Sequence, residues 1–212
     1  MTPPFTIIGI NQAGRRWNLL RPMADNVTTR PTFAKLIVDY YKPSGFCLDP
    51  CRGDGAFFNA LPEPRDWCEI RGGRDFLKYT RKVDWIVTNL PWSGRAYGPI
   101  SRHAFELAEN VVFLVRLQNS LSTYLRHVDF LKHGHGLKEI VVVDWTDAGF
   151  PTEGFALAVI HWERGYRGGT AWTYGLALQL HLSFCANCKC NVLSRIAALY
   201  ASMQGKLVLK CV

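Results

Sequence analysis

Residues 48 to 58 read LDPCRGDGAFF, in which an apolar residue and an acid lead into a glycine-rich turn and then into further apolar residues. The run that starts just before, Phe46 to Leu48, is typical of a short buried strand. Gly53 and Gly55 permit a tight turn and a close approach of the backbone to a ligand, ahead of a helix. A strand, a turn and a helix in this order indicate an α/β unit, although such a turn also occurs without a ligand.

Short apolar runs, separated by helical or loop segments, follow one another along the chain. As strands they are 46–48, 67–68, 75–77, 85–87, 111–115, 140–143 and 155–160. Apolar residues at helical spacing predict helices over 33–41, 100–108 and 121–131, the last of them closed by Gly134 and Gly136. Because the final two runs can pair antiparallel, the pattern predicts an α/β fold with a seven-stranded, mostly parallel sheet, a C-terminal antiparallel hairpin and helices on both faces.

The composition is that of an ordinary folded protein with a basic charge. The chain has 212 residues, 48% of them hydrophobic, and a formal net charge of +8. No apolar run approaches the ~20 residues of a membrane span, and the first residues lack the layout of a signal peptide. These features predict one main domain in a cytoplasmic (intracellular), reducing setting, without a membrane, and they favour a polyanionic partner without specifying one.

The predicted domain organisation has three parts. Residues 1–27 show no clear periodicity and are expected to form an N-terminal arm, residues 28–165 hold the main domain, and residues 166–212 form a linker and a Cys-containing tail. Residues 164–175 are rich in glycine and aromatics and are interpreted as a linker or surface loop. Cys47, Cys51 and Cys68 are interpreted as buried free thiols.

The tail contains a cysteine cluster that is compatible with zinc. Cys185, Cys188 and Cys190 lie near His181 and Cys211, and together they can supply four ligands. Since only one pair has metal-like spacing, a metal-free cluster is the preferred interpretation, and no metal site is assigned.

Polar residues follow the predicted strands at the edge where open α/β sheets bind ligands. Glu69 comes twenty positions after Asp49, a spacing suited to a carboxylate that accepts hydrogen bonds from ribose hydroxyls. A solvated carboxylate is the alternative. Residues 84 to 93, DWIVTNLPWS, end a strand with an amide, a proline and a large aromatic ring.

Four of these motifs in this order, LDPCRGDGAFF, WCEI, GRDF and NLPW, resemble those of the S-adenosylmethionine-dependent amino-methyltransferases of the Asn-Pro-Pro-Tyr/Trp type, which act on adenine in nucleic acid. The match covers residues 28–165. The resemblance implies a Rossmann-like class I methyltransferase sheet with S-adenosyl-L-methionine as cofactor. TTRPTFAKLIVDYY, residues 28–41, is similar to the segment that closes over the methionine end of the cofactor in that family.

The resemblance also implies which residues form the site. The turn from Asp49 would hold the amino-acid part of the cofactor, Glu69 the ribose, and Asp75 with Phe76 the adenine ring. The full cofactor-binding set is Thr29, Asp49, Pro50, Cys51, Gly53, Gly55, Glu69, Asp75 and Phe76. The catalytic set is Asn89, Leu90, Pro91 and Trp92.

The chemistry of methylating an exocyclic amine explains the catalytic set. The nitrogen lone pair is delocalised into the ring, so two acceptors that bind both amine hydrogens favour a pyramidal, more nucleophilic nitrogen. The Asn89 side-chain oxygen and the Leu90 carbonyl can supply them, Pro91 stiffens the turn, and Trp92 can stack on an extruded base. Leu90 replaces the proline usual at this position, which makes the turn less rigid and leaves open a degenerate, non-catalytic subunit.

The predicted reaction is transfer of a methyl group to the N6 amino group of adenine in DNA. The alternatives are adenine in RNA, a cytosine amine or a protein glutamine, and a non-catalytic subunit that binds nucleic acid. The chain has no room for a large recognition domain, so a partner subunit is one way to select the target. Phe150 and Phe155 are candidate walls of the base pocket, with core packing as the more common role. Candidate phosphate contacts are Arg15, Arg16, Arg21, Arg30, Arg95 and Arg102.

Overall fold

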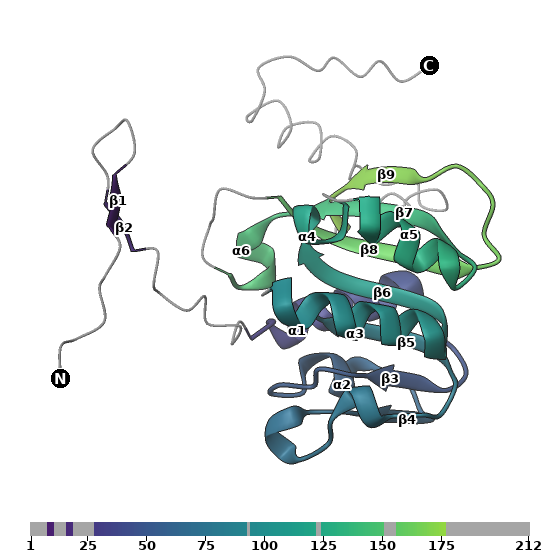
Figure 1. Ribbon diagram of the computed structural model, residues 1–212. Coiled ribbons are helices and arrows are strands. Elements are labelled where there is room, and N and C mark those ends of the chain that lie inside the picture. The colour runs from purple at the N-terminus through teal and green to yellow at the C-terminus, as the bar shows by residue number, and fades with distance from the viewer. Residues whose placement is uncertain are drawn as a thin grey trace, which may run out of the picture.

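A seven-stranded mixed sheet forms the centre of the computed structural model, which describes residues 8–10, 16–18, 28–92, 94–121, 124–150 and 156–176 (Figure 1). The strands in chain order are β3 (Cys47–Asp49), β4 (Arg65–Trp67), β5 (Val83–Asn89), β6 (Ala108–Arg116), β7 (His135–Val143), β8 (Leu157–Arg164) and β9 (Ala171–Tyr174). Their order across the sheet is β4-β3-β5-β6-β8-β7-β9. β8 runs antiparallel to both neighbours and every other pairing is parallel, which confirms the predicted sheet and its antiparallel hairpin.

Helices cover both faces of this sheet, as predicted. They are α1 (Pro31–Tyr41), α2 (Ala56–Ala60), α3 (Gly94–Leu107), α4 (Leu117–Leu121), α5 (Tyr124–Lys132) and α6 (Trp145–Ala148), with 3₁₀ turns η1 (Ile70–Gly72) and η2 (Phe76–Lys78). Successive strand residues point to opposite faces, so Val87 packs in one core cluster with Ile37 of α1, and Ile86 in the other with Phe105 of α3. The two helical layers therefore bury most residues of the central strands β5 and β6.

The seventh strand is not the one that the sequence predicts. Residues 75–77 form no strand, because the Asp75 carboxylate accepts a hydrogen bond from the Leu77 amide and caps η2. The seventh strand is β9, so the prediction of a linker or loop over residues 164–175 is wrong for Ala171–Tyr174. β9 is a four-residue edge strand whose Trp172 and Tyr174 are exposed, so it contains no buried apolar run of the kind that predicts a strand.

Smaller predictions have mixed outcomes. Gly134 follows α5, but Gly136 lies within β7 and does not close the helix. Cys47 and Cys68 are buried free thiols, as predicted, whereas Cys51 is a free thiol that is only half-buried. Residues 1–27 contain β1 (Ile8–Ile10), paired antiparallel with β2 (Arg16–Asn18), and the cysteine cluster of the tail lies outside the described residues. None of the helices in the described ranges is long and apolar enough to cross a membrane.

Candidate active site

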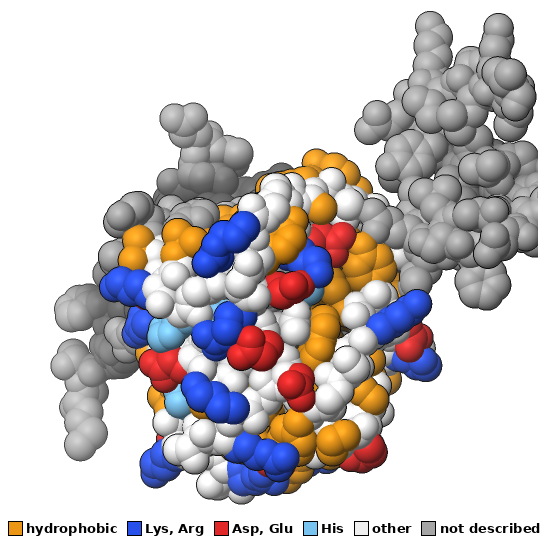
Figure 2. All heavy atoms as spheres, turned by 90° about the vertical axis from the view of Figure 1, so that its right-hand side faces the viewer, with side chains coloured by type: hydrophobic (Ala, Val, Ile, Leu, Met, Phe, Trp, Pro, Cys, Tyr) orange, Lys and Arg blue, Asp and Glu red, His pale blue; other side chains and the backbone are white. Residues whose placement is uncertain are grey.

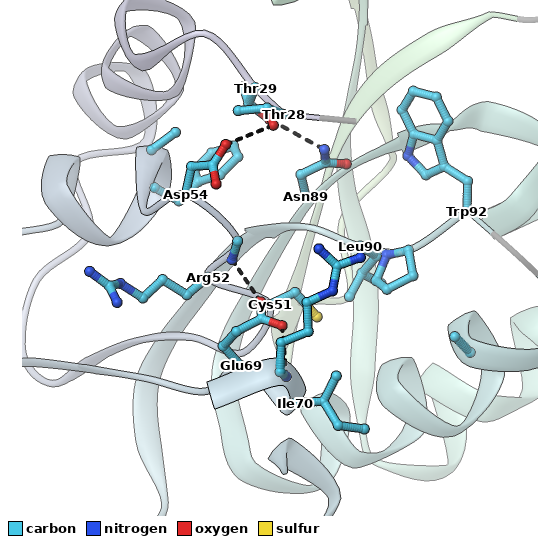
Figure 3. A pocket seen from close by; sticks show the side chains of 16 residues that line it. Thr28, Thr29, Cys51, Arg52, Asp54, Glu69, Ile70, Asn89, Leu90 and Trp92 are labelled. Atoms are coloured by element: carbon cyan, nitrogen blue, oxygen red, sulfur yellow. Dashed lines mark hydrogen bonds between the residues drawn. The ribbon is translucent and has the colours of Figure 1, made fainter. Parts of the chain in front are cut away.

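A pocket of about 640 Å³ opens at the carboxyl ends of β3, β4 and β5 (Figure 3). Its walls come from the glycine-rich turn after β3, the residues after β4, the turn after β5, and the segment before α1. Of the predicted site residues, those that line it are Thr29, Cys51, Gly53, Glu69, Asn89, Leu90, Pro91 and Trp92. The fold thus brings the whole predicted catalytic set and part of the predicted cofactor-binding set to one cavity.

Asp49 holds the glycine-rich turn from a buried position. Its side chain is 1% exposed and accepts hydrogen bonds from the Thr88 hydroxyl (2.7 Å), the Cys51 amide (3.3 Å) and the Phe58 amide (3.0 Å). Burial raises the pKa of Asp49 to about 6, against the lowering effect of these hydrogen bonds. Asp49 is not among the residues that line the pocket, and neither are Pro50 and Gly55. Within the turn, Cys51 and Gly53 form the wall.

Glu69 joins two walls of the pocket. One carboxylate oxygen accepts a hydrogen bond from the Gly53 amide at 2.8 Å, and the other accepts from the Arg71 amide at 3.2 Å. Ile70, next to it, is 75% exposed and offers an apolar surface in the same wall. A carboxylate beside an exposed apolar side chain suits a ligand that has both hydroxyls and a flat ring.

Several lining residues are not predicted from the sequence. They are Thr28, Arg52, Asp54, Ala56, Phe57, Ile70, Arg71 and Ala96. Most of them flank predicted residues, so their position next to a motif was the available signal. Conversely, Asp75 and Phe76 do not line the pocket: Asp75 caps η2, while Phe76 is 4% exposed and packs edge-on against His103. Their contact with an adenine ring stays a prediction.

The turn after β5 is held by contacts with the segment before α1. The Asn89 side-chain amide donates a hydrogen bond to the Thr29 hydroxyl (3.3 Å), and Thr29 is 4% exposed. The neighbouring Thr28 hydroxyl donates to the Asp54 carboxylate (2.9 Å). Figure 3 shows the Asn89 nitrogen directed to Thr29 and its oxygen directed to the side of Trp92.

Trp92 is more deeply packed than a stacking platform would be. Only 7% of it is exposed, and the Arg116 guanidinium carbon lies 4.7 Å from the centroid of its ring. Trp145 and Phe150 make edge-to-face contacts with it, and the Asn119 amide donates to its carbonyl at 2.9 Å. Phe150 therefore belongs to the core, and base stacking by Trp92 stays a prediction. Phe155 lies outside the described residues.

The basic residues are interspersed with acidic ones on one face of the molecule (Figure 2). On the face that Figure 2 shows, away from α6, Lys and Arg side chains intermingle with Asp and Glu. Arg30 donates to the Thr146 carbonyl (2.9 Å), and Arg102 pairs with Asp129 (3.3 Å). The side chains of Arg15, Arg16, Arg21 and Arg95 are outside the described set. Their contacts with phosphate remain predictions.

The fold is that of the class I S-adenosylmethionine-dependent methyltransferases. A proposed class I S-adenosylmethionine-dependent methyltransferase from Listeria monocytogenes superimposes with a TM-score of 0.54 at 12% identity, covering 74% of this chain and 68% of that chain. A proposed RNA methyltransferase from Pyrococcus horikoshii gives 0.52 at 12% identity, covering 69% and 92%.

A chain from a type I restriction-modification system gives a TM-score of 0.50 at 14% identity, with coverage of 71% of this chain and 45% of that chain. No protein-family model and no curated protein sequence matches the chain. At such identities the likeness shows the fold, and S-adenosylmethionine is the cofactor expected of this fold.

Proposed function

We propose that this protein is an S-adenosylmethionine-dependent methyltransferase that acts on the N6 amino group of adenine in DNA. One observation carries the proposal: Asn89, Leu90 and Pro91 share a single pocket with the glycine-rich turn and Glu69. A strand-ending amide turn of this kind suits an amine acceptor, and the turn and carboxylate suit a nucleoside-containing donor.

The residues present fit S-adenosylmethionine. Glu69 would accept hydrogen bonds from the ribose hydroxyls, Ile70 would pack on the adenine ring, and the turn at Cys51 and Gly53 would face the amino-acid part. When bound, the cofactor supplies a methyl group on a sulfonium, which is already an excellent leaving group. The protein then has to align and stabilise the reactants, and no covalent intermediate is needed.

The amine would be held by two oxygens at the end of β5. The Asn89 side-chain oxygen and the Leu90 carbonyl accept its hydrogens and stabilise the positive charge that develops on nitrogen during attack. Leu90 is 1% exposed, so its side chain anchors the turn in the core and compensates in part for the missing proline. Pro91 limits the remaining backbone freedom.

RNA is the second candidate substrate. The likeness to a proposed RNA methyltransferase favours it, because that protein is matched over 92% of its own length. The likeness to a chain of a type I restriction-modification system, whose structure concerns complex assembly, accords with the proposal of a partner subunit. A non-catalytic subunit that keeps the cofactor fold is the alternative of a different class.

The direct test is to incubate the protein with S-adenosylmethionine and with DNA or RNA, digest each nucleic acid, and identify methylated nucleosides by mass spectrometry. We expect N6-methyladenine from DNA. N6-methyladenine from RNA alone would transfer the activity to RNA, and methylated cytosine would change the target base. Cofactor binding in calorimetry without any product would favour the non-catalytic subunit.

Replacing Asn89 with alanine tests the amine-binding role. Asn89→Ala should raise the barrier to methyl transfer by roughly 3 kcal/mol, the scale of one lost charge-stabilising hydrogen bond, with cofactor affinity nearly intact. Glu69→Ala is the matched counterpart and should mainly weaken cofactor binding. Unchanged single-turnover rates in Asn89→Ala would remove Asn89 from the mechanism.

A further inference from the structure

Three consecutive residues before α1 contact residues at or after the carboxyl ends of three different strands. Thr28 contacts Asp54 after β3, and Thr29 contacts Asn89 at the end of β5. Arg30 donates through its backbone amide to the Ala148 carbonyl (3.1 Å) of α6, which follows β7. Thr29 is the member of this segment that touches the proposed catalytic amide.

The hydroxyl of Thr29 has a specific hydrogen-bonding capacity. A hydroxyl carries one proton and two lone pairs, so it can accept from one group while it donates to another. In the structure it accepts from the Asn89 amide, which leaves its own proton for an acceptor in the pocket that both residues line. When no pocket acceptor binds this proton, the Thr29 hydroxyl could equally donate it to the Asn89 side-chain oxygen. The Asn89 amide would then have the opposite orientation, with its oxygen toward Thr29.

We propose that Thr29 is a positioning residue that couples cofactor binding to the orientation of the Asn89 amide. The Thr29 hydroxyl would donate a hydrogen bond to an oxygen of the bound cofactor, so toward Asn89 it could only accept, and the Asn89 nitrogen would have to face it. The Asn89 oxygen then faces the target amine. This inference rests on the proposed function, and it adds a role for Thr29 that is separate from affinity for the cofactor.

Coupling of this kind has two consequences. A chain of hydrogen bonds from the cofactor through Thr29 to Asn89 polarises the Asn89 oxygen and makes it a better acceptor. Because coupling is reciprocal, the filled cofactor site and the amine site strengthen each other's binding.

The first test reads the Asn89 side chain directly. The full chain is labelled with ¹⁵N-asparagine, the Asn89 NH₂ signals are assigned with Asn89→Asp, and spectra are recorded with and without S-adenosylhomocysteine. In the wild type we expect S-adenosylhomocysteine to shift these signals and slow their exchange with solvent. Thr29→Val, which keeps the shape and removes the hydroxyl, should abolish this response, while Thr29→Ser should retain it.

Thr28→Val is the matched control, because it removes a hydroxyl from the same segment without touching Asn89. Its Asn89 signals should respond to S-adenosylhomocysteine as in the wild type. Circular dichroism establishes that each variant is folded. The coupling would be overturned if S-adenosylhomocysteine left the Asn89 signals of the wild type unchanged, or if it still changed them in Thr29→Val.

The second test separates positioning from affinity. At saturating S-adenosylmethionine, Thr29→Val should slow single-turnover methyl transfer by about 10- to 100-fold. This rate loss is no larger than the one expected when a group that stabilises the charge directly is removed. Thr29→Ser should recover most of the rate. A rate loss that saturating cofactor restores would mean a simple binding role and would contradict the proposal. If the wild type transfers no methyl group to nucleic acid, the proposed function fails, and the Asn89 signals still decide the role of Thr29.

Discussion

Asp49 shows how one buried carboxylate organises the cofactor side of the pocket. Its oxygens hold the Cys51 and Phe58 amides and the Thr88 hydroxyl, so they fix the start of the glycine-rich turn, the start of α2 and the end of β5 together. Removing either carboxylate oxygen leaves at least one of these three donors without its acceptor, which costs about 1–3 kcal/mol for each buried donor. The carboxylate therefore has a structural role, and its contact with the cofactor stays a prediction.

The raised pKa of Asp49 predicts a specific pH dependence of stability. Burial raises this pKa from 3.8 in the unfolded chain to about 6 in the folded one, so between these values the folded protein binds more protons. Stability due to Asp49 should then fall as the pH rises from about 4 to 6, and level off above it. The free energy of unfolding is measured in urea for the wild type and for Asp49→Asn across this pH range. The difference between the two values at each pH reports the contribution of Asp49. A difference that stays constant or rises with pH would contradict the assignment.

At the scale of elements, α6 is tied to the start of α1 through Arg30 and Gly149. Gly149 ends α6 with φ of +86°, and a Cβ there would lie 2.5 Å from Arg30 Cγ. Arg30 could move away only by giving up its bond to the Thr146 carbonyl. Because Arg30 follows Thr29, this packing helps to set the segment that contacts Asn89.

Two glycine substitutions separate this packing from backbone strain. Gly149→Ala and Gly165→Ala both place a side chain at positive φ, which costs roughly 1–2 kcal/mol, but a Cβ at Gly165 meets nothing within 4 Å. We expect Gly149→Ala to lose about 1 kcal/mol more than Gly165→Ala in urea unfolding, the value of one hydrogen bond. Equal losses would show that the contact with Arg30 contributes nothing.

At the scale of the whole molecule, the excess of basic residues predicts how binding to DNA depends on salt. The net charge is +8, yet the described charges on the face in Figure 2 are mixed, so that face presents no uniform basic patch. If about four phosphates are neutralised on binding, affinity should fall roughly 100-fold between 50 and 200 mM salt, since each contact releases counterions. Fluorescence anisotropy with labelled DNA measures this dependence. Affinity for S-adenosylhomocysteine, measured alongside, should change far less, and a DNA affinity that ignores salt would rule out phosphate contacts as the source of binding.

The sequence by itself determined the α/β class of the fold, six of the seven strands and the position of the main motifs. Apolar periodicity is local, so it located α1, β6 and the β7–β8 hairpin correctly. The residues after β3, β4 and β5 were also identifiable, because parallel strands necessarily bring their carboxyl ends to one edge.

Only the tertiary structure decided which of these residues meet in the pocket. β9 becomes a strand because the edge of β7 offers it hydrogen bonds. The side chain of Phe76 lies in the core because residues 76–78 form the 3₁₀ turn η2 and no strand. Trp92 is packed by Arg116, Trp145 and Phe150, and the contact between Thr29 and Asn89 joins residues sixty positions apart. These outcomes depend on pairings between distant segments, and local propensity carries no information about which distant segment will be the partner.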